Sequence, residues 1–233
     1  MSDALLVVEH LGLATKAGPV FTDVSFTVAP GAVTVVVGPS GSGRSALLLA
    51  VTGRMRGLTG SVGLAGRSPS RPRDLRAVTS VARLSRLVEP EGRLSVAESV
   101  TERALIEGVD PAAAEQVVTE LEELLGVSFG RDLLVDQLDA CTQTLFCVVL
   151  ALVRPAELVV LDDADRSLDL ATQRRLFDAL TRLAASGRTL LVSTAEIAAV
   201  PASAALVALP SVQPPAPPAP ADPAAPLTQK KTA

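Results

Sequence analysis

The chain has 233 residues, a formal net charge of −4 and a hydrophobic fraction of 48%. This length fits one large domain with an embedded subdomain, and the acidic balance gives no reason to expect a nucleic-acid partner. With two cysteines, one histidine and neither tryptophan nor tyrosine, the chain has few residues for disulfides, thiol or imidazole metal centres, or aromatic stacking.

Hydrophobic patterning in the first part of the chain predicts three strands, at Leu5–Val8, Val24–Val28 and Val33–Val37. The third is a continuous run of β-branched residues, which is typical of a strand buried on both faces. It leads directly into a glycine-rich loop. Ser45–Thr52 continues beyond that loop as an apolar helix.

The middle of the chain changes from strands to helices. Gly60–Gly66 predicts a short edge strand and turn, and Ala77–Ala82 predicts another strand. Between them, Arg67–Arg76 is basic and interrupted by prolines, so we expect a solvent-exposed loop there. Ser95 and Glu98 have the spacing of a capping box, which marks the start of a helix.

The remainder alternates helices with strands, and this alternation predicts an α/β fold with a mainly parallel sheet. Helices are expected at Pro111–Leu125, after an N-cap at Asp110, and at Cys141–Val153 and Leu170–Ala185. Strands are expected at Leu158–Leu161, Thr189–Ser193 and Ala204–Leu209. Residues 210–233 hold eight of the seventeen prolines, mixed with alanine. We therefore expect a disordered tail from residue 210 onward.

Cys141 and Cys147 lie six residues apart in an apolar helical run and are expected to be buried core thiols. The N-terminus has no basic segment followed by an apolar stretch, and the longest apolar run, Leu145–Val153, is too short to span a bilayer. The sequence therefore predicts a cytoplasmic protein that reaches the inner face of the cell membrane only through a partner.

The glycine-rich loop has the form of a phosphate-binding P-loop, GxxxxGK[ST], with one exception. Gly38, Gly43 and Ser45 match the motif, whereas Arg44 stands in place of the lysine. Glycines let backbone N–H groups approach phosphate oxygens at the start of a helix. Arginine is planar and bulkier than lysine and is not equivalent to it. We expect Ser40, Gly41, Gly43, Arg44 and Ser45 to contact phosphate.

Three further segments carry a resemblance in order and spacing over roughly residues 4–209. They are the Val24–Gly31 lead into the P-loop strand, the Gly60–Gly66 turn, and Leu161–Asp169, which is similar to an LDEPTSALD block. Together with the P-loop they resemble the nucleotide-binding subunit of ATP-binding cassette (ABC) transporters. The resemblance implies a P-loop NTPase core of ABC type with an antiparallel β-subdomain and an inserted helical subdomain at about 93–153, within a domain over 1–209.

The resemblance also implies roles for two consecutive carboxylates. Asp162 matches the residue that holds Mg²⁺ together with Ser45. Asp163 stands where the family has the glutamate that orients the attacking water, and it is one methylene shorter. Since reaction geometry tolerates little displacement, Asp163 is a weak candidate for the catalytic residue.

Other positions depart from the family pattern. Leu138–Thr142 occupies the place of the LSGGQ signature, with Asp139 instead of serine and neither glycine. The switch histidine would fall at Ala195, the Q-loop glutamine aligns with Arg83, and Ala14–Ala17 has no aromatic residue to stack on adenine. The only histidine, His10, is expected to be a surface or packing residue.

Taken together, these departures predict an ABC-type subunit that binds ATP and Mg²⁺ weakly and hydrolyses ATP poorly or not at all. Its implied partners are a membrane permease or a second cassette subunit, in a homodimer or heterodimer. A second interpretation is a scaffold or regulatory protein that keeps the fold and binds no nucleotide. A third is a small-molecule kinase, because GPSGSG also resembles nucleoside-monophosphate kinase loops; the two strands before the loop disfavour it.

Overall fold

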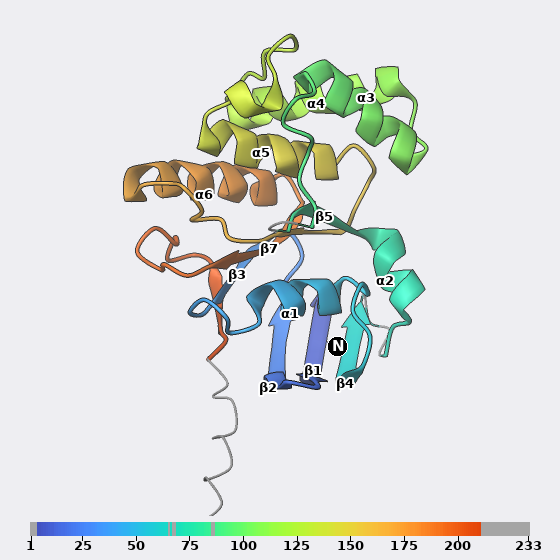
Figure 1. The fold of residues 1–233 in the computed structure, drawn as a ribbon, viewed down its shortest axis with the longest axis vertical. Helices are drawn as coiled ribbons and strands as arrows, with labels where there is room; N and C mark the ends of the chain where they lie inside the picture. The colour runs from blue at the N-terminus through green and yellow to red at the C-terminus, as the bar shows by residue number, and fades with distance from the viewer. Residues whose placement is uncertain (1–3, 65, 67–68, 85–86, 211–233) are drawn as a thin grey trace, which may run out of the picture.

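The computed structural model describes residues 4–64, 66, 69–84 and 87–210. Two sheets and several layers of helix make up the fold (Figure 1). Helices α5 and α6 lie on one side of the larger sheet, with α3 and α4 stacked beyond them. The smaller sheet and α1 lie on the other side. This arrangement is the predicted ABC-type P-loop fold.

The smaller sheet is antiparallel, in the order β2-β1-β4, with β1 at Leu6–Thr15, β2 at Gly18–Val28 and β4 at Leu58–Leu64. The first two strands form a longer hairpin than the sequence patterning predicts. Shifts in register break the alternation of apolar and polar residues, and His10 and Asp23 adopt positive φ there. His10 is exposed, and a hydrogen bond and charge interaction with Asp23 raise its pKa.

The larger sheet is parallel, in the order β5-β6-β7-β3-β8. Its strands are β3 at Val33–Val37, β5 at Thr79–Arg83, β6 at Leu158–Leu161, β7 at Thr189–Thr194 and β8 at Ala205–Ala208. Strands β3 and β6 have the predicted bounds, and the others differ by one or two residues at their ends. The carboxyl ends of the central three strands meet at one edge of the sheet, where parallel α/β sheets bind ligands.

Six α-helices and one short 3₁₀ helix occur in the described parts of the chain. They are α1 at Arg44–Val51, α2 at Pro72–Val78, α3 at Val96–Glu107, α4 at Pro111–Leu125, η1 at Val135–Gln137, α5 at Ala140–Ala151 and α6 at Leu170–Ala185.

Helix α2 corrects the expectation of a loop over Arg67–Arg76. Pro72 lies at the first turn of the helix, where its missing N–H costs nothing, and Asp74 and Arg76 complement the helix dipole. One proline of this basic segment therefore begins a helix and does not interrupt one. The start of the predicted loop and the predicted tail beyond Pro210 lie outside the described residues.

The larger sheet separates two hydrophobic cores. One contains Phe146 and Phe177 together with the sheet face that α5 and α6 cover. The other contains Phe21 and Leu47, between the sheets and beneath α1. Cys147 is buried in the first core, and burial raises its pKa to about 11. Cys141 is only half-buried, since it lies in the first turn of α5, so the expectation of two buried thiols is correct for one of them.

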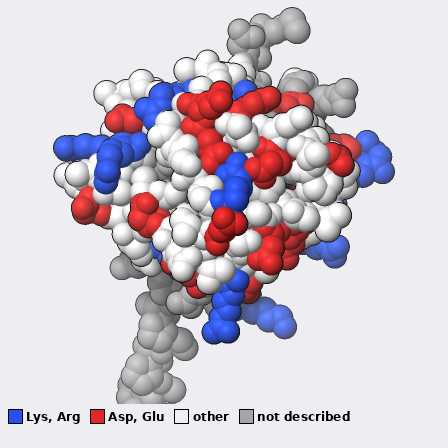
Figure 2. All heavy atoms as spheres, turned by 90° about the horizontal axis from the view of Figure 1, so that it is seen from above, with Lys and Arg blue, Asp and Glu red and all other residues white. Residues whose placement is uncertain are grey.

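None of the described helices is long and apolar enough to cross a membrane. Seen from the side of α3 and α4, the molecule carries many acidic side chains, with basic side chains scattered among them (Figure 2). Those two helices contribute seven glutamates and a single arginine, Arg103. This face is therefore acidic.

Candidate functional site

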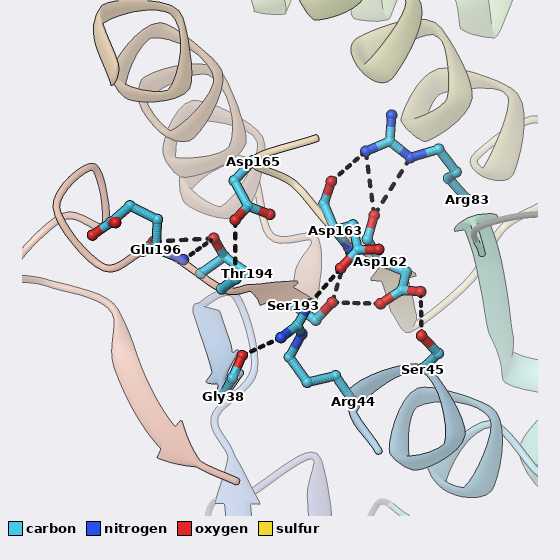
Figure 3. A network of polar contacts seen from close by, with 11 residues as sticks. Gly38, Arg44, Ser45, Arg83, Asp162, Asp163, Asp165, Ser193, Thr194 and Glu196 are labelled. Atoms are coloured by element: carbon cyan, nitrogen blue, oxygen red, sulfur yellow. Dashed lines mark hydrogen bonds and ion pairs between the residues drawn. The ribbon is translucent and has the colours of Figure 1, made fainter. Parts of the chain in front are cut away.

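The carboxyl ends of β3, β6 and β7 bring the predicted site residues together (Figure 3). The loop from Pro39 to Ala46 and the side of Asp163 line one cavity of about 290 Å³. Asp162 lies beside this cavity and is fully buried. Residues that are more than 115 positions apart in sequence thus share a site because β6, β7 and β3 run parallel in that order, so their carboxyl ends meet at one edge of the sheet.

The loop backbone has the geometry that phosphate binding requires. Gly41 and Gly43 have φ of 81° and 92°, a region that favours glycine. At Gly38, a Cβ atom would lie 2.3 Å from the Leu209 carbonyl oxygen and 2.6 Å from Ser42 Oγ. Ser42 Oγ is buried and has no hydrogen-bond partner among the described residues. The glycines therefore allow a tight loop that no larger residue could form.

Helix α1, which the loop opens, differs from the longer helices at its N-terminus. Its N-cap is Gly43, which offers no side-chain hydrogen bond, whereas the N-caps of α3, α4, α5 and α6 are serine or aspartate side chains that accept backbone N–H bonds. Among the described residues, the first N–H groups of α1 thus have no side-chain cap. An uncapped helix start after a glycine loop fits an anion such as phosphate.

Arg44 does not point freely into the loop. Its Nη1 donates to the carbonyl oxygen of Gly38, and its Nη2 donates to Asp163 Oδ1 at 2.7 Å. The Arg44 side chain is only 10% exposed, and its Nε is buried without a partner in the described structure. The cation at the lysine position therefore forms an ion pair with the carboxylate at the glutamate position.

Asp162 accepts hydrogen bonds at both carboxylate oxygens. Ser45 Oγ donates to Oδ2 at 2.6 Å, and Ser193 Oγ donates to Oδ1 at 2.5 Å. The described residues contain no group of three or more His, Cys, Asp or Glu side chains that could hold a metal ion alone. Mg²⁺ commonly uses one or two protein oxygens with waters and phosphates, so Ser45 and Asp162 fit that ion beside a bound nucleotide.

Asp163 is held in an uncommon backbone conformation, with φ of 47°. Its N–H donates to Ser193 Oγ at 2.9 Å, and its carbonyl oxygen accepts from Arg83 Nη2 at 2.7 Å. Aspartate tolerates this left-handed region better than most residues do. The backbone of Asp163 is thus fixed on both sides, which fixes the direction of its Cα–Cβ bond.

Arg83, at the predicted Q-loop position, is 6% exposed and lies at the end of β5. Its Nη1 donates to Thr144 Oγ1 of α5 at 2.8 Å. Its Nη2 and Nε donate to the carbonyl oxygen of Asp162 at 3.2 and 3.4 Å. Arg83 therefore ties α5 to the backbone that carries both site carboxylates.

Asp139, at the signature position, caps its own helix. Its carboxylate accepts from the N–H groups of Cys141 and Thr142 at 3.1 and 3.2 Å and from the Thr142 hydroxyl at 2.5 Å. The bond from the Thr142 hydroxyl, with those from the two N–H groups, lowers the pKa of Asp139. The N–H groups of Cys141 and Thr142, in the first turn of α5, thus already donate to the negatively charged side chain of Asp139.

Replacing Asp139 with alanine should lower the free energy of unfolding by about 1 kcal/mol near pH 7, the usual effect of losing an N-cap. Because the folded pKa of Asp139 lies below its usual value, this contribution is full above that usual value and disappears as pH falls through the folded pKa. Urea unfolding of both proteins between pH 2 and 7 measures it. A difference that grows with acidity would contradict the capping role.

The structure also shows the two positions where the sequence lacks the family's switch histidine and its adenine-stacking aromatic residue. Ala195 stands at the position of the switch histidine, and its N–H donates to Asp165 Oδ2 at 2.9 Å. The segment Ala14–Ala17 forms the turn of the β1–β2 hairpin, where Thr15 Oγ1 accepts from the Ala17 N–H. Neither place offers an imidazole or an aromatic ring.

Ser193 and Thr144 were not singled out as site residues from the sequence. Ser193 contacts both carboxylate residues, and it could have been found because it lies near the end of a buried strand parallel to the one that precedes Asp162. Thr144 gives no such signal. It lies in an apolar helix, and only its contact with Arg83 brings it to the site.

The ABC transporter family matches residues 21–166 of the chain. The zinc import ATP-binding protein ZnuC of Pseudomonas entomophila is 29% identical over 190 residues, covering 78% of this chain and 65% of that protein. The lipoprotein-releasing system ATP-binding protein LolD of Novosphingobium aromaticivorans is 29% identical over 203 residues, covering 83% and 91%. The chain thus spans just under two thirds of the length of the zinc import relative.

A solved structure agrees with these relatives at the level of the fold. The structure of cbiO1 from Clostridium perfringens, described as part of the ABC transporter complex cbiONQ, matches with a TM-score of 0.71 at 19% identity. The match covers 84% of this chain and 80% of that chain. Identity this low shows a shared fold alone.

Proposed function

The chain belongs to the ABC transporter family, and on that basis we propose that it is an ATP-binding transporter subunit that binds ATP and Mg²⁺ weakly and hydrolyses ATP poorly or not at all. One observation carries this proposal. The two residues that replace the family's lysine and glutamate, Arg44 and Asp163, are paired with each other at 2.7 Å.

Binding is supported by the loop itself. The uncapped start of α1, the positive-φ glycines and the buried Ser42 Oγ fit a phosphate group. Ser45 and Asp162 would hold Mg²⁺, which when bound neutralises phosphate charge. The missing adenine platform in the hairpin turn removes base stacking, worth about 1–3 kcal/mol on nucleic-acid-binding surfaces, and this makes binding weak.

Poor hydrolysis is supported by positions on both sides of the site. Asp163 is engaged by Arg44, and its backbone is fixed, so its carboxylate is not free to orient a water molecule. At the signature position, Asp139 has already occupied the N–H groups of α5. In a dimer of the family type, that segment would present a carboxylate to the partner's phosphate and repel it.

We place a membrane permease or a second cassette subunit as the partner. The large hydrophobic side chains Leu87, Leu105 and Ile106 are 68–72% exposed, and the first and last of these line a hollow of about 530 Å³. Exposed apolar residues around a hollow are typical of protein interfaces. The acidic face of α3 and α4 (Figure 2) suits a basic partner segment, and the cytoplasmic loops of membrane proteins are rich in Lys and Arg.

Equilibrium titration of the purified chain with ATP, with and without Mg²⁺, tests the proposal. We expect weak binding that Mg²⁺ strengthens, and an ATPase rate close to background. Complete absence of binding at millimolar ATP would contradict the proposed binding. Fast hydrolysis by this chain alone would contradict the proposed loss of activity.

The alternative is a scaffold or regulatory pseudo-ATPase that binds no nucleotide. The Arg44–Asp163 pair favours it, because this pair satisfies both charges within the chain. ATP binding and copurification with a partner distinguish the two functions. A chain that binds no ATP yet copurifies stably with a permease or a second cassette subunit would support the scaffold.

A further inference from the structure

The Arg44 guanidinium joins two sides of the nucleotide cavity. One end of it bonds the carbonyl oxygen of Gly38, at the start of the loop, and the other bonds Asp163, after β6 (Figure 3). Asp163 itself lines the cavity with the loop residues. The ion pair therefore crosses from the phosphate loop to the opposite wall.

The pair is held firmly. The Arg44 side chain is 10% exposed and that of Asp163 is 29% exposed, so water and salt screen their attraction less than on an open surface. The backbone of Asp163 cannot swing away easily, because Ser193 Oγ accepts its N–H and Arg83 donates to its carbonyl oxygen. The backbone of Asp163 is held by these two bonds, and its carboxylate is held by Arg44.

A nucleoside triphosphate carries a γ-phosphate that would reach the Arg44–Asp163 pair, whereas a nucleoside diphosphate does not. In a P-loop the backbone N–H groups hold the α- and β-phosphates, while the motif cation reaches toward the β- and γ-phosphates. Asp163 lines the cavity opposite the loop. The family resemblance implies that this position orients the attacking water, and hence that it lies on the γ side. A γ-phosphate would therefore have to displace Arg44 from Asp163 and would then lie against a carboxylate, which repels it.

We infer that the Arg44–Asp163 ion pair is a latch across the γ-phosphate end of the site, so that the site takes nucleoside diphosphates in preference to triphosphates. This inference rests on the proposed nucleotide site and deepens it by naming the ligand class. A diphosphate uses the loop and the start of α1 with the pair intact. A triphosphate binds well only when the pair is opened.

The test compares ADP with a non-hydrolysable ATP analogue by calorimetric titration, at fixed ionic strength and without Mg²⁺. The wild-type chain should bind ADP several-fold more tightly than the analogue. Asp163→Asn should strengthen analogue binding about tenfold and change ADP binding much less, because it removes the repelling charge. Asparagine also tolerates positive φ, so this variant keeps the backbone conformation.

Asp165→Asn is the matched control. It removes a carboxylate two residues away that accepts from the Ala195 N–H. In the described structure the side-chain partners of Arg44 are Gly38 and Asp163, not Asp165. We expect it to leave the ratio of the two affinities unchanged. The latch is overturned if the wild-type chain binds the analogue as tightly as ADP, or if both variants shift both nucleotides by the same factor.

The outcome also separates the latch from the proposed function. If the wild-type chain binds neither nucleotide at millimolar concentration, the proposed weak ATP binding fails. The latch is then judged by Asp163→Asn alone. Gain of analogue binding in that variant supports the latch, and continued absence of binding overturns it. Thermal unfolding of each variant confirms that it is folded before titration.

Discussion

Replacing Arg83 with alanine should lower the free energy of unfolding by about 3–4 kcal/mol, because several buried acceptors lose their donor together. The Arg83 guanidinium donates hydrogen bonds to the carbonyl oxygens of Asp162 and Asp163 and to the hydroxyl oxygen of Thr144. Arg83 is 6% exposed, so water cannot easily replace it. Urea unfolding, with the slope and midpoint fitted together, measures the change.

Two further variants show what causes the loss. Arg83→Met keeps most of the side-chain volume but donates no hydrogen bond, so it should remain destabilised by at least half as much. Arg174→Ala removes an exposed arginine from α6 and should change stability by less than about 0.5 kcal/mol. An Arg83→Met protein as stable as the wild type would show that these buried hydrogen bonds make no net contribution to the free energy of unfolding.

Replacing Asp162 with alanine should weaken the apparent affinity of the nucleotide-bound chain for Mg²⁺ about 100-fold, the upper range for disturbing a metal site. Asp162 is the one carboxylate hydrogen-bonded to the Ser45 hydroxyl, at 2.6 Å, in the described structure. Without it, Ser45 remains as the single protein oxygen of the proposed site. Titration of Mg²⁺ into the chain saturated with ADP measures the effect.

This variant also leaves the Ser193 hydroxyl without its acceptor, so a general loss of structure must be separated from loss of the metal. ADP affinity in the absence of Mg²⁺ provides that separation, since we expect it to fall by no more than about threefold. Asp165→Asn again serves as the control for charge. Unchanged Mg²⁺ affinity in Asp162→Ala would show that Asp162 does not hold the metal.

Local signals predicted many elements well because several of them act together. Helix α4 has its N-cap at Asp110, a proline at its first position and its C-cap at Gly126, and its bounds match. Helix α6 likewise begins after an aspartate cap and matches over Leu170–Ala185. Where a capping residue, a periodic apolar face and a C-terminal stop residue coincide, these local signals largely determine where the helix begins and ends.

The sequence predicts which residues of the candidate site lie near one another, but it does not predict the contacts between their side chains. The P-loop and the Leu161–Asp169 block place Arg44, Ser45, Asp162 and Asp163 near one another through fold alone. Their pairing depends on side-chain direction and on the positive φ of Asp163, which no pattern of residues reveals. The same is true of Arg83, whose partners come from two separate segments, helix α5 and the residues after β6.

The parallel sheet has a consequence for how such a chain tolerates change. Its central strands β3, β6 and β7 are almost wholly buried and mainly aliphatic. The positions Asp163 and Ala195 lie just beyond strand ends, and Arg44 begins helix α1 after the loop. Substitutions there alter chemistry while leaving the hydrophobic interior untouched. Such an architecture allows the residues beyond the strands to change one at a time while the sheet keeps its packing.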